Sequence, residues 1–177
     1  MTEVNQAAPA PAQQPRRWPG LLLLIVAIFE FMGGLGALPI LAGDLNEVPG
    51  PGLGGAIVIA TIILQPIAAA AALFFLVRGD LPGALVSMAI VILAGWLSYL
   101  PSVQLHGLEM QADGAGGLLT FALIILPPIL VLTITGLALM GKHLTLATLL
   151  AILPTLVSIL SVVAFGIGVA IYGFSRV

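Results

Sequence analysis

Long apolar runs alternate with short polar segments along most of the chain. The runs cover residues 21–42, 54–77, 81–100, 118–140 and 144–173. A helix rises 1.5 Å per residue, so about 20 apolar residues cross a hydrocarbon core about 30 Å thick. The pattern therefore predicts an all-α integral membrane protein, a bundle of about five transmembrane helices.

The last run is too long for one perpendicular crossing and too short for two crossings joined by a turn. We expect one tilted helix over 144–173, kinked near Pro154, because proline removes a backbone donor inside a helix.

Composition narrows the class of protein further. Hydrophobic residues make up 60% of the 177 positions and charged residues 7%, too few to cover a water-facing surface. Residues 1–20, rich in Pro, Ala and Gln, predict a disordered cytoplasmic tail before the bundle of residues 21–177. The 5 Lys and Arg residues are scattered, which argues against a nucleic-acid partner. The chain has no Cys and hence no thiol nucleophile, disulfide or iron–sulfur ligand.

Basic residues predict the orientation. Four of the five basic residues precede the first run or lie between runs 2 and 3 or 4 and 5, and so fall on one side: Arg16, Arg17, Arg78 and Lys142. The loops on the other side, 43–53 and 101–117, contain none, and Arg176 is the only basic residue expected there. Basic loops stay in the cytoplasm, so we expect the N-terminus inside and the C-terminus outside, in a cell membrane of the bacterial cytoplasmic type.

Aromatic residues agree with this orientation. Trp18 lies at the inner end of the first run, and Trp96, Tyr99 and Tyr172 lie near outer ends, where amphipathic rings prefer to sit. An alternative is that the first run is a cleaved signal peptide, with small residues near Ala42 at the cleavage site. Glu30 interrupts the apolar run, which favours a retained helix.

The chain contains an internal similarity. Residues 52–67 (GLGGAIVIATIILQPI) align with residues 114–129 (GAGGLLTFALIILPPI), with nine of sixteen positions identical. Both segments start on the same side, so spans 2–3 and 4–5 are predicted to form a parallel duplicated hairpin. Such a repeat either builds a site where its halves meet or serves packing alone, and we favour packing.

Glu30 is the strongest candidate for chemistry. It lies near the middle of the first span, where burial favours the neutral acid and an ionisable side chain is a candidate for proton or cation handling. Helical spacing places it on one face with Ala27, Gly34 and Ala37, so it should face another helix. We expect its partner to be Gln65, the amide in the second span. Glu30 and Gln65 either hold the two helices together by a hydrogen bond, or Glu30 gains and loses a proton as part of the protein's function.

The stretch Phe29-Glu30-Phe31-Met32-Gly33 resembles the first-helix glutamate segment of small four-helix multidrug transporters. The resemblance implies a proton-coupled role for Glu30. It covers this stretch alone, because the chain length, the outer loops and the duplication differ from that family.

Outside the membrane, His106, Glu109 and Asp113 are weak candidates for a metal site, since helical spacing would place them on one face. A solvated acidic loop is the simpler interpretation, so we expect no metal and no cofactor. The sequence contains no Ser–His–Asp, HExxH or phosphate-binding glycine motif.

Small residues near the end of the last span indicate contact with a helix of the same chain or of a partner. They are Ala164, Gly166, Gly168 and Ala170. The prediction is a non-enzymatic membrane module that packs with other helices in a homo-oligomer or a larger complex. A small proton- or cation-coupled transporter or channel using Glu30 is the alternative, and an intramembrane enzyme is a third, weaker possibility.

Overall fold

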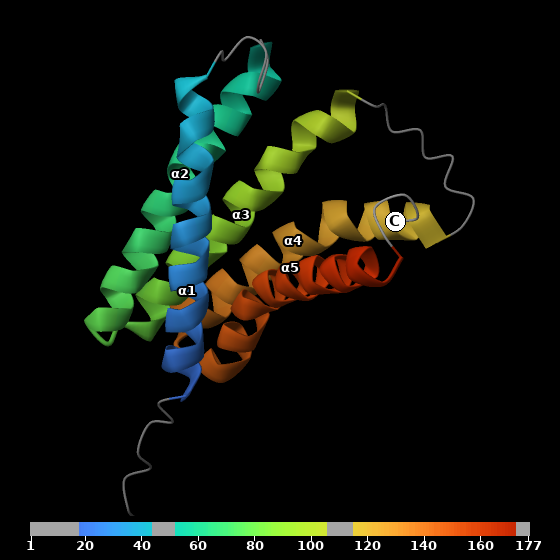
Figure 1. Cartoon of the computed structure of the whole chain (residues 1–177). Helices are drawn as coiled ribbons and strands as arrows, with labels where there is room; N and C mark the ends of the chain where they lie inside the picture. Colours follow the sequence, from blue (N-terminus) through green and yellow to red (C-terminus); the bar gives the residue numbers. More distant parts are fainter. Residues whose placement is uncertain (1–17, 44–51, 106–114, 173–177) are drawn as a thin grey trace, which may run out of the picture.

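The described part of the chain forms a helical bundle. A computed structural model describes residues 18–43, 52–105 and 115–172 (Figure 1). Five α-helices and one 3₁₀ helix follow in order: α1 (Trp18–Ala37), η1 (Leu38–Ala42), α2 (Gly52–Val77), α3 (Leu81–Leu105), α4 (Ala115–Met140) and α5 (Leu144–Tyr172).

Four segments among the described residues are long and apolar enough to cross a membrane. They are Trp18–Ala42, Gly52–Val77, Leu81–Tyr99 and Leu144–Ile171. These segments match expected spans 1, 2, 3 and 5, and they fit a membrane-embedded protein. Helix α4 has 26 residues and contains a shorter apolar segment, Ile124–Leu139. The fifth crossing, through α4, stays a prediction.

The first span starts earlier than expected and ends, as expected, at Ala42. Helix α1 begins at Trp18, three residues before Leu21, because Pro19 falls in the first turn, where a backbone N–H has no helical acceptor. The last five residues of this span, after α1, form the 3₁₀ helix η1, which contains Pro39. Pro39 cannot donate to the turn before it, so the α-helix ends at Ala37.

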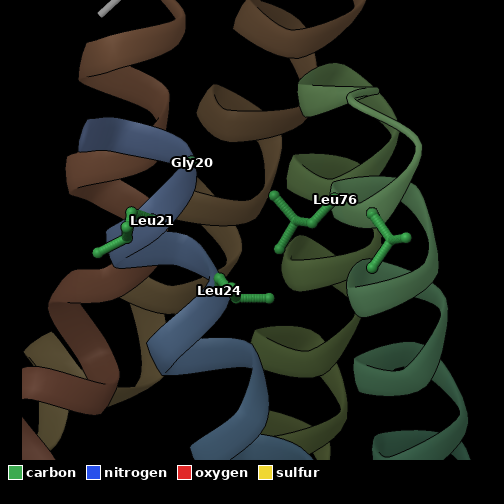
Figure 2. A pocket seen from close by; sticks show the side chains of 5 residues that line it. Gly20, Leu21, Leu24 and Leu76 are labelled. Atoms are coloured by element: carbon green, nitrogen blue, oxygen red, sulfur yellow. The ribbon is translucent and has the colours of Figure 1, made fainter. Parts of the chain in front are cut away.

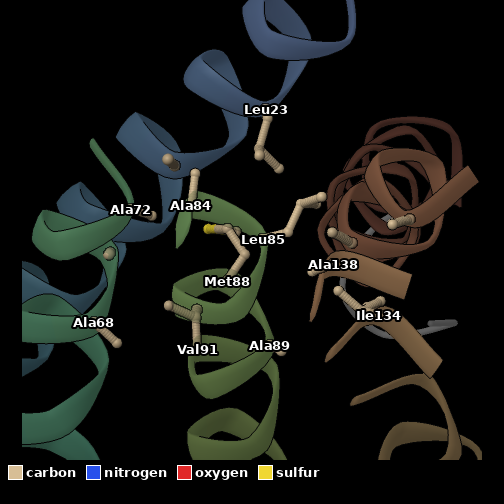
Figure 3. Packing of buried hydrophobic residues seen from close by; sticks show 14 of the residues in the cluster. Leu23, Ala68, Ala72, Ala84, Leu85, Met88, Ala89, Val91, Ile134 and Ala138 are labelled. Atoms are coloured by element: carbon tan, nitrogen blue, oxygen red, sulfur yellow. The ribbon is translucent and has the colours of Figure 1, made fainter. Parts of the chain in front are cut away.

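Helix α3 lies at the centre of the bundle and contacts the other four α-helices. Its buried residues include three alanines, which let neighbouring backbones approach closely. Figure 3 shows Leu85 directed toward Ile134 and Ala138 of α4, with Ala68 and Ala72 of α2 on the opposite side. The core therefore joins both hairpins through α3.

The two hairpin turns have the same backbone geometry. Each contains a glycine in the left-handed region, Gly79 at φ 77° and Gly141 at φ 63°. The glycine and the following residue donate backbone bonds to carbonyls three and five residues earlier, as in a Schellman turn. The pairs are Gly79–Leu76 (3.0 Å), Asp80–Phe75 (2.9 Å), Gly141–Ala138 (3.1 Å) and Lys142–Leu137 (3.3 Å).

The similarity of the two turns does not extend into the helices that follow them. Helix α5 starts one residue later than the alignment of 52–67 with 114–129 would place it, since His143 at φ 51° is inserted. Helix α2 also packs against α3 more extensively than α4 packs against α5.

Helix α5 is continuous from Leu144 to Tyr172, with Pro154 inside it. Its orange first part and red second part run in different directions in Figure 1, as expected for a proline kink. The part up to Thr155 is packed into the bundle, whereas every residue from 156 to 167 is exposed.

Candidate functional site

Three polar side chains meet between α1, α2 and α5. Gln65 Nε2 donates to Glu30 Oε2 at 3.1 Å, and Thr155 Oγ1 lies 2.6 Å from Glu30 Oε1. Each residue lies near the middle of its own apolar helix, so the cluster lies about halfway along the three helices. Sequence reasoning expected Glu30 and Gln65 to meet, and the structure brings them together. A function for the pair stays a prediction.

Close approach of α1 and α2 places Glu30 beside Gln65. Ala27 and Gly34 are buried on the face of α1 that carries Glu30. A Cβ atom added at Gly34 would lie 3.0 Å from the backbone nitrogen of Pro66, which directly follows Gln65. The missing side chain at Gly34 therefore lets the two helices touch one turn from the carboxyl group.

Thr155 is the member of the cluster that sequence reasoning missed. Hydroxyls in membrane helices usually bond to their own backbone, as Thr148 does to the Leu144 carbonyl at 2.8 Å. Thr155 is 4% exposed and reaches across to α1 instead. One signal was present: Thr148 and Thr155 are seven residues apart, on the face of α5 that carries Ala147 and Ala151.

The cluster can hold Glu30 with or without a proton. The Gln65 amide N–H can only donate, so Glu30 Oε2 is an acceptor in both states. The Thr155 hydroxyl donates to Glu30 Oε1 in the structure, and a hydroxyl can also accept a hydrogen bond from a protonated carboxyl group. When Glu30 is ionised, the hydroxyl rotates and donates to the same oxygen. The same contact thus survives both protonation states.

A second polar contact joins α3 to α4. Trp96 Nε1 donates to the carbonyl of Ile124 at 3.1 Å. That carbonyl has no helical partner, because the residue four positions later is Pro128, which lacks an N–H. The expectation for Trp96 was a place in an aromatic belt. The structure gives its indole N–H a partner inside the protein, since an unpaired carbonyl in hydrocarbon is costly.

Replacing Trp96 with Phe should lower the free energy of unfolding by about 1–2 kcal/mol, since the Ile124 carbonyl loses its donor. Unfolding by SDS titration in mixed micelles would measure this. In a Pro128→Ala background, the residue 128 N–H supplies the missing helical bond, so the Trp96→Phe cost should shrink. An equal cost in both backgrounds would assign the effect to lost ring packing.

The structure does not test the metal candidates outside the membrane. His106, Glu109 and Asp113, the weak metal candidates, lie outside the described residues. His143 is exposed in the turn before α5. Within residues 18–43, 52–105 and 115–172, the structure shows no group of three metal-ligating side chains.

Comparisons with known proteins identify no relative. No protein-family model, curated protein or solved structure matches the chain.

Proposed function

We propose that this chain is a non-enzymatic membrane module that packs with other membrane helices. The observation that carries the proposal is the second half of α5, where residues 156–167 are exposed on every face of the helix. The polar groups in the middle of the bundle, by contrast, are bonded to each other across three helices. The interior thus stabilises this chain, and α5 offers a surface to a partner.

Small residues make the second half of α5 suited to close helix contact. Ala164, Gly166 and Ala170 are exposed, and a Cβ atom at Gly166 would meet nothing within 4 Å. Helices in lipid associate through such small residues, because they allow backbones to approach. Here these residues are available to a second copy of the chain or to another protein.

A photoreactive amino acid at Leu160 or Ile167 tests the proposal in native membranes. These side chains are 59% and 54% exposed, and Ile67 on α2, at 60%, is a matched control. We expect discrete protein adducts from positions 160 and 167 and only lipid adducts from position 67. Lipid adducts alone at all three positions would show that α5 faces lipid and would reject the module.

A proton- or cation-coupled transporter is the second candidate, favoured by the Glu30–Thr155 contact that suits both protonation states. Difference infrared spectroscopy in lipid nanodiscs, with Glu30→Gln to assign the carboxyl band, separates the two. A band that titrates between about pH 6 and 8 and shifts with a ligand would support transport. A band that stays unchanged would favour a structural role.

We also propose that α4 crosses the membrane, and that the N-terminus lies inside. The start of α1 and the turns with Arg78 and Lys142 lie at one end of the bundle in Figure 1, which supports a single basic side. Since the chain has no Cys, thiol labelling of Lys142→Cys from either side of the membrane tests this. The shared turn geometry supports a duplicated hairpin kept for packing.

A further inference from the structure

Helices α1 and α3 are related by the same spacing of 62 residues that relates α2 to α4. Residues 23–39 align with residues 85–101, and seven of the seventeen positions are identical. Burial follows the same spacing. The matching pairs are Leu23 and Leu85, both 0% exposed, and Ala27 and Ala89, 0% and 1% exposed. The pair α1–α2 therefore corresponds to the pair α3–α4.

The contacts within these two pairs repeat as well. Gly34 of α1 meets Pro66 of α2, where an added Cβ atom would lie 3.0 Å from the proline nitrogen. At the corresponding positions of the second pair, Trp96 of α3 bonds to the carbonyl that Pro128 of α4 leaves without a helical donor. Helix α3 also packs against α2, so it has an antiparallel helix on two sides. Among the described residues, α1 has an antiparallel helix, α2, on one side only.

Helix α2 covers one side of α3 with small residues. Ala84 and Val91 of α3 are 0% and 3% exposed. Figure 3 shows both between the α3 ribbon and Ala68 and Ala72 of α2. Alanines four residues apart lie on one face of a helix and let two backbones approach closely. This side of α3 is therefore closed by an antiparallel helix with a small-residue face.

The corresponding side of α1 is open. Its residues are Leu22 and Phe29, which match Ala84 and Val91 at the 62-residue spacing and are 36% and 53% exposed. Figure 2 shows Leu24 directed toward α2. Leu22 comes two residues before Leu24 and Phe29 five residues after it, so they are turned about 160° and 140° away from it around the helix. They therefore point away from α2 and stay exposed.

We propose that the side of α1 formed by Leu22 and Phe29 binds an antiparallel transmembrane helix of another membrane protein. The place corresponds to the one that α2 takes on α3, so the partner helix carries alanine or glycine at a four-residue spacing. Gly33, one turn after Phe29, leaves room for it, because a Cβ atom there meets nothing within 4 Å. This inference rests on the proposed function, to which it adds a second contact side and the kind of helix that is bound.

A second copy of the chain offers no matching helix. In a copy with the same orientation, the helices that run antiparallel to α1 are α2 and α4. The alanines of α2 are already buried against α3, and close packing on Phe29 needs small residues. The exposed sides of α2 and α4 carry mainly large side chains, among them Ile63, Leu64, Ile67, Phe74, Ile125, Leu126, Ile129 and Leu132.

A synthetic peptide with the sequence of residues 52–77 tests this side of α1, because α2 occupies the corresponding place on α3. The full chain and the peptide are reconstituted together in nanodiscs, with a photoreactive amino acid at position 29 or 28. Ile28 is a matched control, because it is 47% exposed and corresponds to Ile90, which stays 38% exposed beside α2 and α4. We expect a peptide adduct from position 29 and lipid adducts alone from position 28.

The peptide supplies a second control and the direction of binding. A peptide with Ala68→Leu and Ala72→Leu should give no adduct at position 29. Because the native peptide binds antiparallel, adducts from position 22 should map nearer to its C-terminus than adducts from position 29. An inserted, helical peptide that gives no adduct at position 29, or equal adducts at 28 and 29, would overturn the proposal. Adducts from position 29 between two copies of the chain would assign this side to a second copy and would also overturn it.

Failure here can be told apart from failure of the proposed function. In native membranes, positions 160 and 167 report on any partner of α5. Lipid adducts alone at those positions would reject a partner on α5 even if the peptide bound to α1. A peptide that gave no adduct at position 29 would reject the open side of α1 and leave the adducts from α5 as evidence for a partner.

Discussion

Glu30→Ala should lower the free energy of unfolding by about 1–3 kcal/mol, whereas Glu30→Gln should change it by less than about 1 kcal/mol. Alanine removes the acceptor for Gln65 Nε2 and the partner of Thr155 Oγ1. Gln65 would then hold an unpaired amide between two helices. Glutamine keeps both contacts, because its carbonyl accepts from Gln65 and its amide N–H donates to the threonine hydroxyl.

SDS titration in mixed micelles, followed by circular dichroism, would measure both variants. Met32→Ala is a suitable control, since Met32 is on the same helix and is 55% exposed. If Glu30→Ala unfolded at the same SDS fraction as Glu30→Gln, the carboxyl group would not bind the three helices together. The proposed structural role of Glu30 would then fail, and the transporter interpretation would gain support.

The contact between Glu30 and Gln65 could be predicted because few alternatives exist in such an apolar chain. A carboxyl group in hydrocarbon needs a polar partner, and the small residues beside Glu30 selected the face that meets a helix. Gln65 was the one amide within a span. Polar residues are rare in these helices, so each one strongly limits the possible packing.

Thr155 and Trp96 could not be assigned in the same way. Several hydroxyls lie within the spans, and each has a local carbonyl to bond with, as Thr133 bonds to the Ile129 carbonyl at 2.8 Å. Which hydroxyl reaches another helix depends on how α5 is rotated against α1. For Trp96, the deciding feature is Pro128 on α4, and only the tertiary structure shows that the two approach.

The hydropathy pattern also could not predict the exact ends of the helices or which of their faces are exposed. That pattern is equally apolar on both halves of α5, yet the first half packs into the bundle and the second is exposed. Lipid-facing and protein-facing positions carry similar residues in a membrane helix, because both environments are apolar. The apolar runs therefore predicted where the helices lie but could not separate their packed faces from their exposed ones.

Gly34→Ala should destabilise the bundle by about 1–2 kcal/mol relative to Gly33→Ala. The added methyl group at position 34 would lie 3.0 Å from the Pro66 nitrogen and 3.1 Å from its Cβ atom. Both are fixed parts of α2, so the helices must separate. At Gly33, the same methyl group meets nothing within 4 Å.

The adjacent glycines make a matched pair. Both substitutions add one methyl group to the same helix and gain the same helix propensity, so the difference between them reports the contact with Pro66. Separation of α1 from α2 would also lengthen the Glu30–Gln65 bond, which is 3.1 Å. The cost of Glu30→Ala should therefore be smaller in a Gly34→Ala background than in the native chain, while Gly33→Ala leaves it unchanged. Equal unfolding free energies for the two glycine variants would mean that α1 and α2 do not meet at this point, and the geometry of the polar cluster would have to be abandoned with it.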